Sequence, residues 1–253
     1  MDYGLIGGKL GHSYSKIIHE KLADYQYELC PLTEEEFTDF MEKKAFRAIN
    51  VTIPYKQKVI PYLTEMDSRA TLIGAVNTIV NRDGKLYGYN TDYAGFDYML
   101  QRHHIDVAGK KCIVLGNGGA AQAVIAVLKN NKARDIIIVK RTTAPGVITY
   151  EECFDSHSDA DVVINTSPVG MYPNTDASPV DLTHFSSCHA VVDLIYNPIE
   201  TQFTAQGRSL GMISVSGLEM LVAQALYAVE IFLGTTLNKE QIDQIYKDVM
   251  STL

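Results

Sequence analysis

The sequence has no cluster of cysteines and no long hydrophobic run. Its four cysteines (Cys30, Cys112, Cys153 and Cys188) are widely scattered, without a Cys-x-x-Cys pair or a Cys/His cluster. This pattern disfavours both a metal site and a disulfide framework, and a reducing, cytoplasmic setting is expected. The longest fully apolar runs, such as residues 136–139, have the length of a strand. They are far shorter than the roughly 20 residues that cross a membrane as a helix.

Positive charge is also scarce. The 253 residues include 22 basic and 30 acidic side chains, which give a formal net charge of −8. Because binding to a nucleic-acid backbone needs a cationic surface, no nucleic-acid partner is expected. The first residues contain neither a basic nor an apolar stretch, so no signal peptide is expected. The length suits one large domain or two smaller ones.

Short apolar runs and helical spacings alternate along the chain. The spacing of apolar residues predicts helices over residues 14–22, 33–43, 93–103, 120–130 and 218–233. Apolar runs bounded by turn residues predict strands over residues 3–6, 25–29, 46–51, 77–81, 85–89, 111–115, 135–140, 161–165, 190–194 and 212–215. Residues 142–160 contain Pro145 and Gly146 and show no clear helical period.

This alternation predicts an α/β fold with two domains. Strands separated by helices are typical of parallel sheets covered on both faces. We expect an αβ domain formed by residues 1–94 and 215–253, with a Rossmann-like domain with a parallel sheet, residues 95–214, between its two parts. In the helix over 218–233, Glu219 and Glu230 share a solvated face, whereas Gln224 points away from them among apolar neighbours. A polar group in that position needs a partner.

A glycine-rich loop follows the strand over residues 111–115. Gly116, Asn117, Gly118, Gly119 and Ala120 lead into a helix in a G-x-G-x-x-A pattern. Glycines permit a tight turn and a close approach of the backbone, and a helix N-terminus favours a pyrophosphate. A glycine-rich turn alone is a weak signal, but the preceding strand and following helix favour binding of a dinucleotide cofactor.

The end of the next strand bears on the choice of cofactor. Lys140, Arg141 and Thr142 stand where NAD-binding proteins usually place an acidic residue. A cationic pair suits the 2′-phosphate of NADP, although two solvated basic residues would look the same. We therefore predict NADP as the cofactor.

Six further segments carry a resemblance to a known family. They are residues 11–16 (GHSYSK), 50–56 (NVTIPYK), 74–78 (GAVNT), 88–92 (GYNTD), 165–171 (NTSPVGM) and 217–225 (GLEMLVAQA). Together with the glycine-rich loop, and in this order, they resemble the shikimate dehydrogenase family over nearly the whole chain. The resemblance implies the reversible, NADPH-dependent reduction of 3-dehydroshikimate to shikimate, a step of chorismate and aromatic amino acid biosynthesis. It also implies that the domain built from both chain ends binds the substrate.

Lys56 and Asp92 match the catalytic pair of that family. Lys56 follows Pro54, where we expect a helix to start, and a cation in a first helical turn opposes the macrodipole. An ordinary surface lysine is the alternative, and a helix N-cap is the alternative for Asp92. The resemblance implies that Lys56 is the general acid and base and that Asp92 anchors it.

The resemblance also implies which residues contact the ligands. Ser13 and Ser15 match serines that bind the substrate carboxylate, although either could simply cap a helix. The other matched substrate residues are Thr52, Asn77, Tyr196 and Gln224. Thr166 lies in a loop after a strand, where α/β sheets bind ligands, and we predict that it contacts the cofactor together with Leu194 and Gly217.

Other functions fit parts of the pattern. A quinate/shikimate dehydrogenase that uses NAD would be expected to carry an acidic residue in place of Lys140 and Arg141. A sensor that binds a nucleotide or a cyclic acid without catalysis would not need both Lys56 and Asp92. A folate-type dehydrogenase with a similar two-domain layout is not supported by Ser13, Ser15 and Gln224. The oligomeric state is left open.

Overall fold

A computed structural model describes residues 1–11, 13–142 and 144–251 of the chain. The chain forms two compact units, Met1–Gly95 with Leu221–Leu253 (unit 1) and Phe96–Met220 (unit 2). The divisions fall inside two helices, α4 (Thr91–Arg102) and α8 (Leu218–Leu233). The boundaries expected from the sequence lie one and six residues earlier in the chain. None of the helices in the described ranges is long and apolar enough to span a membrane.

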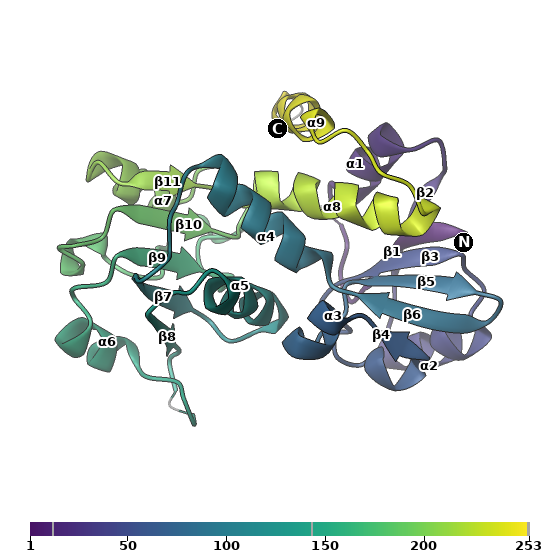
Figure 1. The fold of residues 1–253 in the computed structure, drawn as a ribbon, viewed down its shortest axis with the longest axis horizontal. Helices are drawn as coiled ribbons and strands as arrows, with labels where there is room; N and C mark the ends of the chain where they lie inside the picture. Colours follow the sequence, from purple (N-terminus) through teal and green to yellow (C-terminus); the bar gives the residue numbers. More distant parts are fainter. Residues whose placement is uncertain (12, 143, 252–253) are drawn as a thin grey trace. The chain divides into compact units, whose positions relative to one another are not determined.

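Unit 1 is built on a mixed sheet of order β2-β1-β3-β5-β6-β4 (Figure 1). Its strands are β1 (Tyr3–Gly7), β2 (Tyr27–Pro31), β3 (Ala48–Val51), β4 (Glu65–Met66), β5 (Thr78–Arg82) and β6 (Lys85–Tyr89). Its helices are α1 (Ser15–Leu22), α2 (Glu34–Lys43), η1 (Ile60–Tyr62), α3 (Ser68–Ile73), α9 (Glu240–Met250) and parts of α4 and α8. Strand β1 runs parallel to β2 and β3, whereas β5 is antiparallel to both β3 and β6.

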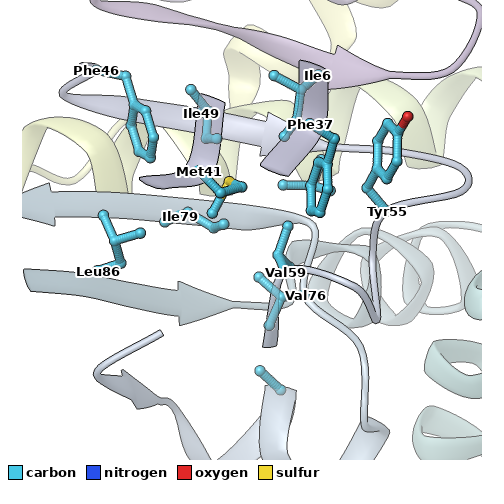
Figure 2. Packing of buried hydrophobic residues seen from close by; sticks show 12 residues of the cluster. Ile6, Phe37, Met41, Phe46, Ile49, Tyr55, Val59, Val76, Ile79 and Leu86 are labelled. Carbon is cyan, nitrogen blue, oxygen red and sulfur yellow. The ribbon is translucent and has the colours of Figure 1, made fainter. Parts of the chain in front are cut away.

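Alternating side chains give this sheet two buried faces, because successive residues of a strand point to opposite sides. On one face, Ile6 of β1 packs with Phe37 and Met41 of α2 in the cluster that Figure 2 shows. On the other face, Leu5 of β1 packs with Phe232 of α8. The sheet is therefore covered by α2 on one side and by the later part of α8 on the other.

Unit 2 contains a five-stranded, all-parallel sheet of order β11-β10-β9-β7-β8. Its strands are β7 (Lys111–Leu115), β8 (Asp135–Val139), β9 (Val162–Asn165), β10 (Ala190–Asp193) and β11 (Ile213–Val215). The helices between them are α5 (Gly119–Asn130), α6 (Tyr150–Ser156), η2 (Leu182–His184) and α7 (Gln202–Ser209). Counted from β7, the strand order is 2-1-3-4-5, the doubly wound arrangement that confirms the predicted fold class.

Some elements differ from the sequence-based expectation. Residues 142–160, expected to lack helical structure, contain α6. Thr149 caps this helix in a capping box with Glu152, so seven residues suffice for a short helix without a long apolar period. Glu219, expected on a solvated face, is only 8% exposed, because its carboxylate lies 2.7 Å from His103 Nε2. Strand β4 and helices α3, α7 and α9 were not predicted individually.

Candidate active site

Lys56 is held in a turn of unit 1 that follows β3. Residues 53–59 form turns rather than the expected α-helix, so the expectation that Lys56 opposes a helix dipole was wrong. Tyr55 anchors the turn: its ring is buried, stacks on Phe37 at a centroid distance of 4.2 Å and donates its hydroxyl to Leu32 O. The Lys56 carbonyl oxygen accepts from Val76 N–H at 2.8 Å. The backbone of Lys56 is therefore fixed on both sides.

The side chain of Lys56 forms an ion pair with Asp92. Lys56 Nζ lies 2.5 Å from Asp92 Oδ2, and the two side chains are 14% and 10% exposed. Asp92 is the second residue of α4 but does not cap it, since Asn90 Oδ1 accepts from Tyr93 N–H. The carboxylate is thus free to hold the lysine. Removing either member of a pair this deeply buried would leave an uncompensated charge.

Asn77 joins the ion pair to the rest of unit 1. Its Nδ2 donates to Asp92 Oδ1 at 2.9 Å, and its Oδ1 accepts from Thr91 N–H at 2.7 Å. Gln224 of α8 completes the group, because its Oε1 accepts from Thr91 Oγ1 at 3.3 Å. Residues from three distant parts of the chain thereby fix the position of one carboxylate.

Four residues that the sequence reasoning did not single out support this group. Asn50 Nδ2 donates to Thr78 Oγ1 and to Asn77 O, and its Oδ1 accepts from the Tyr27 hydroxyl at 2.7 Å. Thr91 supplies the backbone N–H already described. The antiparallel register of β3 and β5 pairs Asn50 directly with Thr78, and this pairing is visible only in the structure. Buried polar groups that are satisfied in this way hold a single arrangement.

The remaining predicted substrate residues are distributed as follows. Ser13 and Ser15 follow β1, and Ser13 Oγ accepts from Ser15 N–H at 3.3 Å at the start of α1. Thr52 follows β3, the parallel neighbour of β1, so the serines and Thr52 come after strands that end at the same edge of the sheet. Within the described part of the chain, the hydrogen bonds of the ion pair do not extend to these three residues. Tyr196 belongs to unit 2, where it is half-buried after β10.

The glycine-rich loop of unit 2 lies at the switch point of its sheet. Strands β7 and β9 are neighbours, and the chain leaves them in opposite directions. At their carboxyl ends, Thr166 donates both its N–H and its hydroxyl to Leu115 O at 2.9 Å. Gly116 has a φ of +114°, and a Cβ there would lie 2.7 Å from Thr166 Oγ1. A side chain is therefore excluded from the point where doubly wound sheets bind their ligands.

The start of α5 is open to an anion. Gly118 is its N-cap, and no side chain of the described residues caps the helix. A Cβ added at Gly118 would meet no atom within 4 Å, and Asn117 is held aside by a hydrogen bond from Gln122. Uncapped N–H groups at a helix N-terminus suit a phosphate. The loop from Gly116 to Ala120 therefore fits a dinucleotide.

The other predicted cofactor residues follow neighbouring strands of the same sheet. Lys140, Arg141 and Thr142 are exposed after β8. Leu194 follows β10, with its N–H donated to Asn165 O at 2.9 Å. Gly217 follows β11, and a Cβ there would lie 2.1 Å from Leu194 O, so only glycine fits. All belong to the carboxyl edge of one parallel sheet.

Fold and sites define an α/β protein of two units, in which one has a doubly wound, dinucleotide-type sheet and the other a buried lysine–aspartate pair. Residues 5–79 match the family described as the shikimate dehydrogenase substrate binding domain. The chain is 38% identical to the shikimate dehydrogenase (NADP(+)) of Clostridium perfringens (strain SM101 / Type A), over 98% of this chain and 97% of that protein. The chain belongs to the shikimate dehydrogenase family.

Solved structures are similar over the same extent. A chorismate mutase/shikimate 5-dehydrogenase fusion protein from Clostridium acetobutylicum has a TM-score of 0.92 at 38% identity, covering 99% of this chain and 97% of that chain. A shikimate 5-dehydrogenase from Thermus thermophilus, in complex with NADP(H) and shikimate, has a TM-score of 0.88 at 26% identity, covering 98% and 99%. These neighbours share the two-domain α/β fold.

Proposed function

We propose that this protein is an NADP-dependent oxidoreductase that interconverts 3-dehydroshikimate and shikimate. The observation that carries the proposal is the 2.5 Å pair between Lys56 and Asp92, held by Asn77 in the unit that contains the matched substrate-binding segment. The near full-length relatives named for this activity and for NADP(+) support the choice of substrate and cofactor.

In the reducing direction, a side chain of the protein donates the proton to the substrate oxygen. As the ketone carbon is reduced, negative charge develops on its oxygen, and the ammonium of Lys56 donates a proton there. In the oxidising direction, the neutral amine accepts the hydroxyl proton of shikimate. Bound NADPH supplies the hydride. Asp92 anchors the lysine in both directions and accepts a hydrogen bond from Asn77.

The ligands would be divided between the two units. We assign the substrate to the unit 1 residues Ser13, Ser15, Thr52, Asn77 and Gln224, with Tyr196 contributed by unit 2. The cofactor would be held by the glycine-rich loop from Gly116 to Ala120, and its 2′-phosphate by the residues after β8. The other cofactor contacts in this proposal are Thr166, Leu194 and Gly217.

The setting of this enzyme would be the cytoplasm. All four cysteines are free thiols, which suits a reducing compartment. Its partners would be small molecules.

A spectrophotometric assay tests the activity directly. Shikimate and quinate are each incubated with NADP and with NAD, and reduced cofactor is followed at 340 nm. We expect turnover of shikimate with NADP to exceed the other three combinations. Preferred turnover of quinate with NAD would replace this proposal with the NAD-dependent alternative. No turnover, with cofactor bound, would favour a sensor.

A further inference from the structure

A carboxylate lies buried beneath the proposed cofactor loops of unit 2. Asp193 ends β10 and has no exposed surface. Its Oδ1 accepts from Asn165 Nδ2 and from Ile195 N–H, each at 3.0 Å, and its Oδ2 accepts from the Thr201 hydroxyl at 2.7 Å. Three donors thus converge on one side chain, two from the loop between β10 and α7 and one from the end of the neighbouring strand β9.

Asn165 extends this arrangement to the next strand. It ends β9, the strand beside β10, in register with Asp193. While its amide N–H group donates to Asp193, its Oδ1 accepts from both the N–H and the hydroxyl of Ser167, at 3.0 and 2.7 Å. The loop that begins with Thr166 is therefore tied to the Asp193 carboxylate.

The same network reaches the end of β11. Asp193 fixes Ile195 through its N–H, and Ile195 O accepts from Gly217 N–H at 2.9 Å. Gly217 also lies against Leu194 O, where no side chain fits. Asp193 therefore holds the residues beside three proposed cofactor contacts. Thr166 follows Asn165, Leu194 precedes Ile195, and Gly217 is bonded to Ile195.

Burying the charged Asp193 carboxylate carries a desolvation penalty. Burial raises the pKa of Asp193 to about 6, and its side-chain partners Asn165 and Thr201 are both uncharged. A buried carboxylate is tolerated only where hydrogen bonds compensate for lost hydration. Here they join the ends of β9 and β10, and through Ile195 the end of β11, rather than neutralise a nearby cation.

We propose that Asp193 is a positioning residue for the cofactor, which sets the loops after β9, β10 and β11 for the half of NADP beyond the pyrophosphate. In doubly wound sheets the first loop takes the pyrophosphate and the second strand end takes the adenosine ribose. The remaining strand ends are left for the nicotinamide half. This inference rests on the proposed function, because it presumes NADP in unit 2.

The test compares the affinity for the whole cofactor, NADPH, with the affinity for its adenosine half. Asp193→Asn keeps the shape but replaces one acceptor oxygen by a donor, and affinities for NADPH and for adenosine 2′,5′-bisphosphate are measured by calorimetry. We expect NADPH binding to weaken ~10-fold, as loss of one charge-assisted hydrogen bond implies, whereas the adenosine bisphosphate should bind within about twofold of the wild-type value. Asp181→Asn, which alters an exposed cap of η2 in the same unit, should change neither affinity.

A milder variant covers the case in which Asp193→Asn does not fold. Thr201→Val removes one donor to Asp193 along with the cap of α7, and Thr149→Val removes the equivalent cap of α6 alone. We expect Thr201→Val, but not Thr149→Val, to lower the affinity for NADPH while leaving the affinity for adenosine 2′,5′-bisphosphate unchanged. Equal loss of both ligands, or no loss of either, would show that Asp193 is merely structural and overturn the inference. A wild-type protein that binds no NADPH would instead overturn the proposed function.

Discussion

At the scale of single residues, a lysine is useful for catalysis here because its partners hold it. The Lys56 ammonium is mostly buried and is paired with Asp92, whereas Lys58, two positions on, is 45% exposed and pairs with Glu34 on the surface. The two lysines share a turn and differ in what surrounds them. They therefore form a matched pair for testing the proposed mechanism.

We expect Lys56→Ala to lower kcat by ~10²–10⁴, the usual effect of removing a general acid. The KM for shikimate should change far less, since the lysine acts mainly where charge develops in the transition state. Lys58→Ala is the control and should retain wild-type turnover. Steady-state kinetics at 340 nm measure both, and near wild-type turnover by Lys56→Ala would remove this residue from the mechanism.

His19 illustrates a different residue-scale effect, on stability. It is fully buried in α1, where Nδ1 contacts the Tyr25 hydroxyl at 2.8 Å and the ring stacks on Tyr27. Burial lowers the pKa of His19 from 6.5 to about 3. Between those values the unfolded chain takes up a proton that the folded chain does not. Stability is therefore lost as pH falls through 6.5 towards 3.

The expected slope is about 1.4 kcal/mol per pH unit for this group alone. Urea unfolding at pH 7 and pH 5 should show a larger loss for the wild-type protein than for His19→Gln, which has no proton to gain. His184→Gln, at an exposed position of η2, should behave as wild type. The raised pKa of Asp193 also makes stability depend on pH in this range. Its contribution is the same in wild type and in both variants, so it cancels in the comparison. Parallel pH dependence in wild type and His19→Gln would contradict the assignment.

At the scale of elements, the two ends of β8 separate cofactor choice from strand stability. Arg141 is exposed just after its carboxyl end, whereas Arg134 precedes its first residue and pairs with Asp135 at 2.9 Å. Only the carboxyl end of a strand in this sheet faces the proposed cofactor. Two similar arginines thus differ in their expected roles.

We expect Arg141→Ala to raise the KM for NADP ~10–100-fold, the worth of one well-made charge-assisted contact, and to leave the KM for NAD nearly unchanged. Arg134→Ala should alter neither. Exposed charge pairs are screened by salt, so the preference of the wild-type enzyme for NADP should weaken at high ionic strength. Equal kcat/KM of the wild-type enzyme for the two cofactors would refute the prediction.

Helix α6 shows what sequence reasoning overlooked at this scale. A search for apolar periodicity finds nothing in residues 142–160, because a helix of seven residues buries little more than Cys153. The capping box of Thr149 and Glu152 was visible in the sequence and marks the start of the helix. Helices α2, α4, α5 and α8, by contrast, were predicted to within two residues, since their apolar stripes repeat several times, whereas α9, of similar length, was not predicted.

At the scale of the molecule, each unit has a separate core, and one of them joins the two ends of the chain. Phe232 of α8 packs with Leu5 and Tyr27, whereas Phe203 of α7 packs in the core of unit 2. Both side chains are buried. Truncating either should cost about 3–5 kcal/mol.

The two truncations should destabilise different parts of the molecule. In hydrogen exchange, Phe232→Ala should lower protection of the amides of β1 and β3 and spare those of β7 and β9, while Phe203→Ala should do the reverse. The physical reason is that exchange reports the stability of the local cooperative unit. Loss of protection in both sheets by either variant would show that the two units unfold as one.

The sequence by itself determined most of the helices and strands, the α/β class and the glycine-rich loop, because side-chain period and backbone freedom are local properties. It also indicated Lys56 and Asp92, though only through resemblance to a family. Only the tertiary structure decided which polar residues are buried together. Glu219 was expected in solvent and meets His103 instead. Likewise Asn77 joins Asp92 and Gln224, and Asp193 joins Asn165 and Thr201. Burial depends on partners remote in sequence, and no local pattern specifies them.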